Sequence, residues 1–207
     1  MGSSLAAAVW WIFFGYLLGS CPTGFVIVKL GMGKDVRDFG SGNIGATNVA
    51  RVMGRKWAIL TAVVDMLKGG VAMIVARSCG VSASALLALV GIAGVLGHDY
   101  PVWLKFNGGK GVAATFGVFA CFGAFNPLPA IIGGVVWLFV REATRMVSLS
   151  SMVALLAAAL VMPFFGMDRA YYLSGLLLAA LTTWRHRENI KRIIAGTENK
   201  VGRFFFK

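Results

Sequence analysis

Residues 149–166 read LSSMVALLAAALVMPFFG, eighteen residues without a charged side chain. A helix that crosses a bilayer needs about 20 mostly apolar residues, so this stretch predicts a membrane-spanning helix. The whole 207-residue chain has the same character, because 58% of its residues are hydrophobic, 14% are charged and its mean hydropathy is +0.78. A soluble domain carries about 25% charged residues. We therefore expect an all-α polytopic membrane protein with one domain, residues 1–207.

Cations mark which loops face the cytoplasm. Seventeen Lys and Arg lie in the first, third and fifth predicted loops and the C-terminal tail. The second, fourth and sixth loops contain only two, Arg77 and Arg169. Cytoplasmic loops are enriched in Lys and Arg, so the split predicts seven transmembrane helices, with the N-terminus outside and the C-terminus in the cytoplasm. Five helices is the alternative, if two weaker segments only enter the membrane. The seven segments are residues 4–28, 57–76, 82–104, 112–126, 129–147, 149–166 and 170–184.

The formal charge of +12 narrows the choice of partners. Because the cations lie in loops between apolar runs, we expect anionic membrane lipid or an anionic substrate, and no nucleic acid. Cys21, Cys79 and Cys121 are scattered in apolar runs, which favours small buried side chains over a disulfide or zinc site. We expect no metal and no cofactor.

The first loop contains a candidate phosphate site at residues 40–51, GSGNIGATNVAR. Backbone N–H groups of glycine-rich turns bind anions, the small polar side chains add neutral donors, and an arginine can grip phosphate oxygens with two hydrogen bonds. A flexible polar linker is the alternative. The candidates are Ser41, Gly42, Asn43, Gly45, Thr47, Asn48 and Arg51.

The third loop, FNGGKGVAAT at residues 106–115, enters a predicted helix. A glycine-rich turn at a helix N-terminus is a site for anions, with Gly109 giving access and Lys110 supplying a point charge. The stretch is not a Walker A loop, because Leu104 stands at the position of its first glycine and Gly111 follows the lysine.

Other polar residues have two interpretations each. His186 and Asn189 begin the tail three residues apart, on one helical face that can turn toward a site, whereas the nearby cations suit a membrane anchor. Asp65 and Lys68 are expected to pair within the second segment, either as a structural ion pair or as the wall of a polar site. His98 is expected to be a structural hydrogen-bonding residue.

Familiar catalytic patterns are missing from the sequence. A histidine with an aspartate five residues later does not occur, since Trp103 and Lys191 stand at that distance from His98 and His186. The sequence also lacks a His-Glu-x-x-His pair and a Gly-x-Ser-x-Gly elbow. The polar loops therefore offer hydrogen-bond donors that suit phosphate groups, but they contain no side chain that is an obvious general base.

Taken in order, these motifs resemble the bacterial acyl-phosphate-dependent glycerol-3-phosphate acyltransferases, the PlsY family. The resemblance rests on residues 40–51, on residues 97–115 with His98, Pro101 and Gly-Gly-Lys-Gly-Val-Ala, on residues 144–149, which bring in Ser148, and on residues 186–189. Two departures are Met146, where an aromatic residue is common, and Asn107, which is often Lys.

The resemblance implies transfer of a fatty acyl group from acyl phosphate to the sn-1 hydroxyl of glycerol 3-phosphate, giving lysophosphatidic acid and phosphate, in the bacterial inner membrane with the site facing the cytoplasm. It implies catalytic roles for Ser41, Asn43, Arg51, Lys110 and His186. Substrate-binding roles fall on Gly42, Gly45, Thr47, Asn48, Gly109, Ser148 and Asn189. We hypothesise that Arg51, Lys110, His186 and Asn189 bind the glycerol-phosphate group, that Ser41 and the Gly42–Gly45 amides hold acyl phosphate, and that the acyl tail lies in an apolar groove.

Two other functions compete with this one. A transporter for an organic phosphate would place its site near the midplane between structural repeats, and the chain shows no repeat. A non-catalytic scaffold would leave the dense polar loops unexplained.

A monomer is expected, since one chain supplies every motif.

Overall fold

The structure, a computed structural model, describes residues 4–202, and these contain helices and connecting segments without strands, so the all-α prediction is confirmed. Arg203 and Lys207, counted among the tail cations, lie outside the described residues. In chain order the elements are α1 (Leu5–Gly19), α2 (Thr23–Met32), η1 (Val36–Asp38), α3 (Ala46–Met53), α4 (Arg55–Ser78), α5 (Ser84–Asp99), η2 (Val102–Leu104), α6 (Val112–Phe125), α7 (Leu128–Thr144), α8 (Val147–Val161), η3 (Met162–Phe165), α9 (Arg169–Arg185) and α10 (Arg187–Ile194).

Each predicted apolar segment contains a long helix, namely α1 or one of α4 to α9. Four helical stretches among the described residues are long and apolar enough to cross a membrane: Leu5–Met32, Arg55–Ser78, Ser84–Leu104 and Val147–Phe165. A shorter apolar helix covers Val112–Gly123. The helices α7 and α9 have 17 residues each.

The structure differs from the sequence prediction in two places, a break in the first segment and an additional helix in the first loop. The segment predicted at 4–28 is interrupted, because α1 ends at Gly19 and α2 begins only at Thr23. Pro22 explains the break, since it lacks an N–H and disfavours helical geometry at the residue before it. The helix α3 was not predicted inside the polar first loop. It forms around buried Val49, which packs with Val28, Val36, Ile44 and Leu104.

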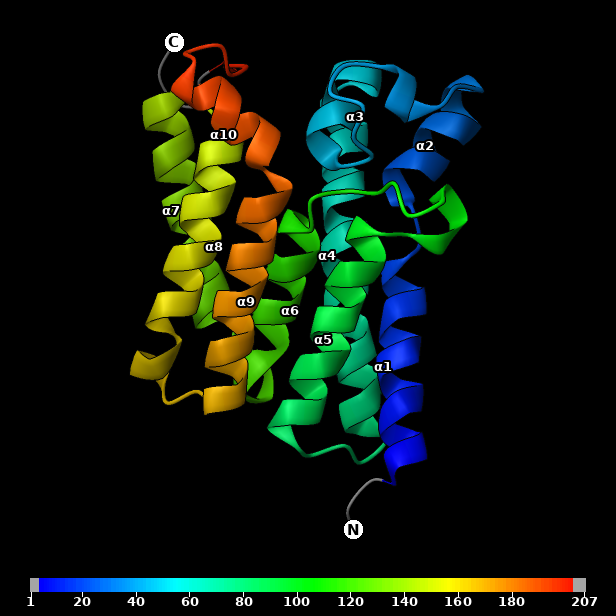
Figure 1. Cartoon of the computed structure of the whole chain (residues 1–207), viewed down its shortest axis with the longest axis vertical. Coiled ribbons are helices and arrows are strands. Elements are labelled where there is room, and N and C mark those ends of the chain that lie inside the picture. The colour runs from blue at the N-terminus through cyan, green and yellow to red at the C-terminus, as the bar shows by residue number, and fades with distance from the viewer. Residues whose placement is uncertain (1–3, 203–207) are drawn as a thin grey trace. The chain divides into compact units, whose positions relative to one another are not determined.

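The chain divides into two compact units, residues 1–118 and 119–207, with the boundary inside α6. In the first unit, α1 packs along α5, and both contact α4 (Figure 1). Glycine permits the close approach, because a Cβ atom at Gly19 would collide with the backbone of Gly94, and one at Gly69 with the backbone of Ala114. The helices α2 and α3 contact one another and α4.

In the second unit, α8 packs between α7 and α9, and α10 follows α9 after a turn at His186 (Figure 1). Phe122 of α6 stacks on Tyr171 of α9 with ring centroids 4.7 Å apart. Through this contact the end of α6 packs against α9, and so against the group formed by α7, α8 and α9.

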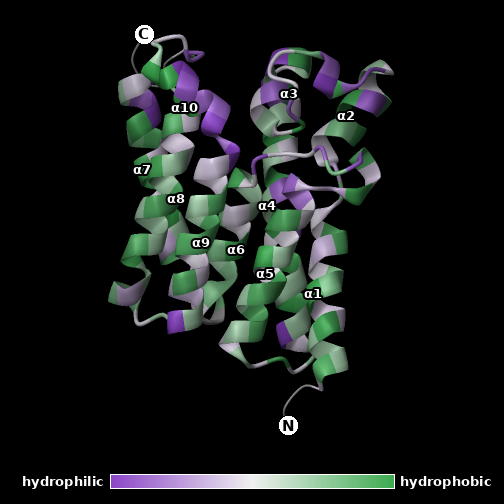
Figure 2. Ribbon diagram, in the orientation of Figure 1, coloured by the Kyte–Doolittle hydropathy of each residue, from purple (hydrophilic) through white to green (hydrophobic). Residues whose placement is uncertain are grey.

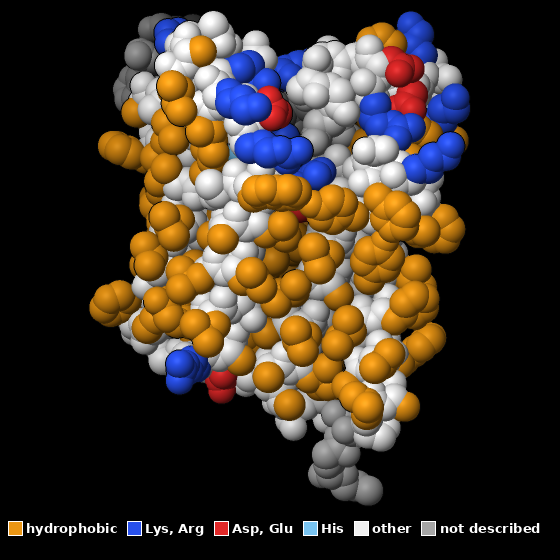
Figure 3. All heavy atoms as spheres, viewed as in Figure 1, with side chains coloured by type: hydrophobic (Ala, Val, Ile, Leu, Met, Phe, Trp, Pro, Cys, Tyr) orange, Lys and Arg blue, Asp and Glu red, His pale blue; other side chains and the backbone are white. Residues whose placement is uncertain are grey.

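Apolar side chains are exposed along the long helices of both units. Val9 on α1 is 58% exposed, Leu67 on α4 is 57%, and Phe139 on α7 is 75%. Hydrophilic residues instead concentrate on α2 and α3 in one unit and on α10 in the other (Figure 2), where Lys and Arg also gather (Figure 3). Exposed apolar flanks of this extent are typical of helices that contact lipid.

Candidate active site

Asn48 organises the first loop. Its side chain is 1% exposed, and its Nδ2 group donates to the carbonyls of Val36, Phe39 and Asn43 at 2.9–3.0 Å. Its Oδ1 accepts from the Ser41 N–H at 2.9 Å. The loop is therefore wound around one buried amide, and Asn48 shapes the loop from within.

Two glycines in this loop have positive φ angles, +58° at Gly40 and +68° at Gly42, a conformation that other residues adopt at a cost. The N–H of Gly42 donates to Phe39 O at 3.0 Å, and that of Gly45 donates to Asn43 Oδ1 at 2.8 Å. The structure thus differs from the predicted anion nest at Gly42–Gly45, because these two amides close the turn itself.

The remaining donors of the loop lie beside the start of α3. This helix begins at Ala46 behind Gly45, which offers no side-chain cap, so its first N–H groups point out of the helix end. Ser41, Thr47 and Arg51 are exposed. The short segment from Ser41 to Arg51 therefore contains two hydroxyl groups, a helix N-terminus and a guanidinium group.

The third loop contacts the first. Asn43 Nδ2 donates to the Gly108 carbonyl at 3.5 Å, a long bond between the two glycine-rich segments. The Gly109 N–H donates to His98 O at 3.0 Å, which anchors the loop on the end of α5. Lys110 comes next and is half-buried. The structure thus brings Asn43, Gly109 and Lys110 to the same end of the first unit.

A carboxylate lies at the start of α6, where the sequence predicted an anion site. Asp99 is fully buried, and a Cβ atom at Gly111 would lie 3.0 Å from its Oδ1. Because a negative group near a helix N-terminus already complements the dipole, the helix end offers less attraction to a second anion. Lys110 is the cation of the loop that directly precedes Gly111 in the sequence.

The predicted ion pair on α4 is confirmed. Lys68 Nζ lies 2.8 Å from Asp65 Oδ1, and both side chains are buried.

In the second unit, three side chains donate to Glu198. Ser148 Oγ and Asn189 Nδ2 reach Oε1 at 2.7 and 2.6 Å, and Arg192 Nε reaches Oε2 at 2.8 Å. Burial by itself raises the pKa of Glu198, but these hydrogen bonds outweigh it and hold the pKa below 4.5. The structure therefore brings Ser148 and Asn189 together around a carboxylate of the same chain.

His186 is buried where α9 ends and α10 begins. Its Nδ1 lies 2.8 Å from the Thr182 carbonyl. A carbonyl only accepts, so Nδ1 carries the proton, and Nε2 is the acceptor of the neutral ring.

Sequence reasoning missed Glu198. The signal was present, since Glu198 is the one acidic residue after Arg192 in a tail rich in cations. An isolated acid among cations is expected to pair, but the tail was interpreted as a membrane anchor, and one of the partners, Ser148 on α8, is 50 residues away in the sequence.

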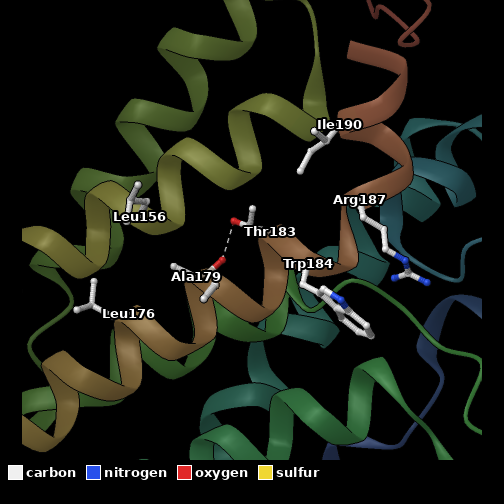
Figure 4. A pocket seen from close by; sticks show the side chains of 8 residues that line it. Leu156, Leu176, Ala179, Thr183, Trp184, Arg187 and Ile190 are labelled. Carbon is white, nitrogen blue, oxygen red and sulfur yellow. Dashed lines mark hydrogen bonds between the residues drawn. The ribbon is translucent and has the colours of Figure 1, made fainter. Parts of the chain in front are cut away.

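An apolar groove of about 430 Å³ lies along α9 between α8 and α10 (Figure 4). Its lining is almost wholly apolar, apart from Thr183, whose hydroxyl donates to Ala179 O at 2.8 Å, and Arg187. The Arg187 guanidinium lies 4.6 Å from the centre of the Trp184 ring. The groove is lined by Leu156, Leu176, Ala179, Ala180, Thr183, Trp184, Arg187 and Ile190.

Comparisons with known proteins agree with this arrangement. The family model described as glycerol-3-phosphate acyltransferase matches residues 9–196. Proteins of that name from Roseobacter denitrificans and Aquifex aeolicus are 46% and 42% identical over 202 and 194 residues, which cover 97% and 93% of this chain and 97% and 98% of the relatives.

Two crystal structures are also similar. Both are of PlsY (YgiH), described as an integral membrane glycerol 3-phosphate acyltransferase. The glycerol 3-phosphate form has a TM-score of 0.87 at 41% identity and covers 94% of this chain and 96% of its own. The lysophosphatidic acid form has a TM-score of 0.85 at 40% identity, with coverages of 94% and 95%.

The helical fold with lipid-facing flanks and glycine-rich polar loops is that of an integral membrane acyltransferase. The chain belongs to the glycerol-3-phosphate acyltransferase family, and the resemblance drawn from its motifs is confirmed.

Proposed function

We propose that this protein transfers a fatty acyl group from acyl phosphate to the sn-1 hydroxyl of glycerol 3-phosphate, giving lysophosphatidic acid and phosphate. Relatives named glycerol-3-phosphate acyltransferase support the acceptor, and the lysophosphatidic acid form of PlsY supports the product. The observation that carries the proposal is the contact of Asn43 with Gly108, which joins the two glycine-rich loops of the first unit, residues 40–51 and 106–115.

Roles follow from the donors that the loops present. Arg51 and Lys110 supply the positive charge for the phosphate of glycerol 3-phosphate. Ser41 and Thr47 with the start of α3 supply neutral donors for acyl phosphate, while Gly42, Gly45 and Asn48 maintain the loop conformation. The family resemblance assigns His186, Asn189 and Ser148 to the substrates as well, and kinetics of His186→Ala and Asn189→Ala with each substrate test those assignments.

The chemistry needs little beyond positioning. The sn-1 hydroxyl oxygen attacks the acyl carbonyl carbon, the bond from that carbon to the phosphate oxygen breaks, and inorganic phosphate leaves. A phosphate oxygen of the substrate accepts the hydroxyl proton. Neutral donors stabilise the developing oxyanion, and because acyl phosphate is already activated, correct placement of the two substrates supplies much of the rate.

The experiment uses purified protein in lipid with acyl phosphate and radiolabelled glycerol 3-phosphate. We expect lysophosphatidic acid to form with acyl phosphate and not with acyl coenzyme A. Lys110→Met should raise the KM for glycerol 3-phosphate by about tenfold or more, as expected when a charge-assisted hydrogen bond is lost. Lys105→Met is the matched control, because Lys105 is an exposed cation of the same loop. A normal KM for Lys110→Met would refute the role of Lys110.

The membrane arrangement extends the proposal. Seven transmembrane helices, with the N-terminus outside and the C-terminus in the cytoplasm of the inner membrane, are supported by a long helix in each apolar segment and by the 17-to-2 division of cations. One catalytic domain is supported by the family match, which runs through both compact units. We propose that the enzyme acts as a monomer, which light scattering in detergent tests directly.

The groove along α9 is our candidate for the acyl tail. Its apolar walls suit a hydrocarbon chain, and Arg187 at one end suits an anionic head (Figure 4).

A further inference from the structure

The buried ion pair on α4 reaches the break between α1 and α2. Lys68 is 5% exposed, and its Nζ donates to the Cys21 carbonyl at 2.6 Å as well as contacting Asp65. Cys21 lies between the two helices, directly before Pro22. The ammonium group therefore connects the middle of α4 to the place where the first apolar segment is interrupted.

The carboxylate of the pair faces His98 in the last turn of α5. Asp65 Oδ1 lies 3.6 Å from His98 Nδ1, and the exposed fractions of these side chains are only 3% and 4%. A carboxylate this close orients an imidazole ring by electrostatic attraction, even beyond ideal hydrogen-bond length.

The other side of the imidazole ring supports the Gly-Gly-Lys loop. A Cβ atom at Gly109 would collide with His98 Nε2, so the ring lies directly against the Gly109 backbone. The Gly109 N–H also donates to the His98 carbonyl at 3.0 Å. Both the side chain and the main chain of His98 thus fix the residue that precedes Lys110.

We propose that Asp65, Lys68 and His98 are positioning residues for the reaction, which set the location of Lys110 through Gly109. The inference rests on the proposed role of Lys110 in binding phosphate. A displacement of about 1 Å at a substrate-binding group can reduce the rate of an enzyme by about a hundredfold. A buried pair of charges is costly to maintain, and a positioning role explains its presence beneath this loop.

The first test removes both charges together. In Asp65→Leu/Lys68→Met, apolar side chains of similar volume replace the pair, a change that folded proteins commonly tolerate. We expect the double variant to stay folded, with an unfolding temperature somewhat below the wild-type value because the Cys21 carbonyl loses its bond from Lys68. The KM for glycerol 3-phosphate should rise about tenfold, with kcat changed less than about threefold, because one charge-assisted contact to His98 is lost. A folded double variant with the wild-type KM would overturn the proposal.

The second test compares two side chains of similar size at one position and does not depend on the double variant folding. His98→Asn retains an N–H that can face Asp65, and His98→Leu does not. We expect the Leu variant to raise the KM for glycerol 3-phosphate by about tenfold and the Asn variant by less than about threefold. Equal KM values in the two variants would show that His98 only fills space.

Two controls separate the possible failures. Thr61→Val changes a fully buried side chain on α4, one turn before Asp65. The Thr61 hydroxyl donates to Trp57 O of its own helix at 2.8 Å. It should leave the KM unchanged. If Lys110→Met leaves the KM unchanged, the proposed role of Lys110 fails. If Lys110→Met raises the KM while the Asp65 and His98 variants do not, only the positioning inference fails.

Discussion

The Asn48 side chain has four hydrogen-bonding partners: three carbonyls that share the two hydrogens of Nδ2, and the Ser41 N–H, which donates to Oδ1. The three acceptors are main-chain carbonyls from separate turns of the first loop. Buried carbonyl groups that lose their partner destabilise a fold by about 1–3 kcal/mol each. The conformation of the loop therefore depends on the amide nitrogen of this residue more than on its oxygen.

Asn48→Asp tests this dependence with almost no change in shape. An oxygen would replace Nδ2 and face three carbonyl oxygens, so we expect the free energy of unfolding to fall by about 3 kcal/mol, together with a loss of activity. Thermal unfolding in detergent measures the effect. Asn107→Asp is the control, because Asn107 is exposed and donates to the Lys105 carbonyl at 3.2 Å. Equal stability of the two variants would contradict the structural role of Asn48.

Glu198 makes the stability of the second unit depend on pH. The pKa of Glu198 is lower in the folded protein than the ordinary value of 4.5, because three donors favour the charged form. Such a group stabilises the fold above its unfolded pKa, and this contribution is lost as the pH falls through the folded pKa.

Unfolding temperatures of the wild type and Glu198→Gln between pH 7 and pH 3 should reveal this contribution. We expect the wild type to be more stable at neutral pH and the difference to shrink below about pH 4.5, where the carboxylate takes up a proton. Glu188→Gln serves as the comparison, because Glu188 and its partner Lys191, 3.1 Å away, are both exposed and solvent weakens such a pair. A difference that stays constant over this range would argue against the linkage.

At the scale of elements, α8, α9 and α10 form the apolar groove, and a bulky residue on its wall should shorten the space for an acyl tail. We expect Ala180→Trp to reduce kcat/KM for long-chain acyl phosphate more than for short-chain acyl phosphate. Leu177→Trp provides the comparison, because Leu177 is exposed on α9 outside the groove. The same loss for both chain lengths would exclude the groove as the acyl site.

The sequence predicted the elements well where hydrophobic runs are long. All seven apolar segments contain helices, because helix is the conformation in which a lipid-exposed segment satisfies its own backbone hydrogen bonds. The break at Pro22 was missed since apolar residues continue on both sides of it. The helix α3 was missed because its eight residues have low mean hydropathy and depend on packing of Val49 against distant Val28 and Leu104.

The candidate site was predictable in its residue types and less so in its contacts. Glycine and small polar residues indicated the two loops, and in the structure Asn43 of one loop contacts Gly108 of the other. The partners of individual groups, such as Glu198 for Asn189 or Asn48 for the Ser41 amide, depend on tertiary structure. Spacing along the chain carries little information about them.

At the scale of the whole molecule, the proposed topology predicts which loops are reached from each side. After replacement of the native cysteines by alanine, single cysteines at Lys34 and Asp168 should react with a membrane-impermeant thiol reagent from opposite sides. We expect Lys34→Cys to be labelled in inside-out vesicles and Asp168→Cys in intact spheroplasts. Labelling of both from one side would rule out seven spanning helices with the proposed orientation.

The neutral hydrogen bonds around Asn48 have a consequence for the behaviour of the enzyme at different ionic strengths. Counterions weaken attraction between exposed charges, with a screening length of about 8 Å at 0.15 M salt, but they barely affect hydrogen bonds between buried neutral groups. Added salt should therefore weaken the capture of anionic substrates by Arg51 while the first loop keeps its conformation. A rise in the salt concentration around the enzyme would then reduce its affinity for these substrates reversibly, without unfolding of the loop.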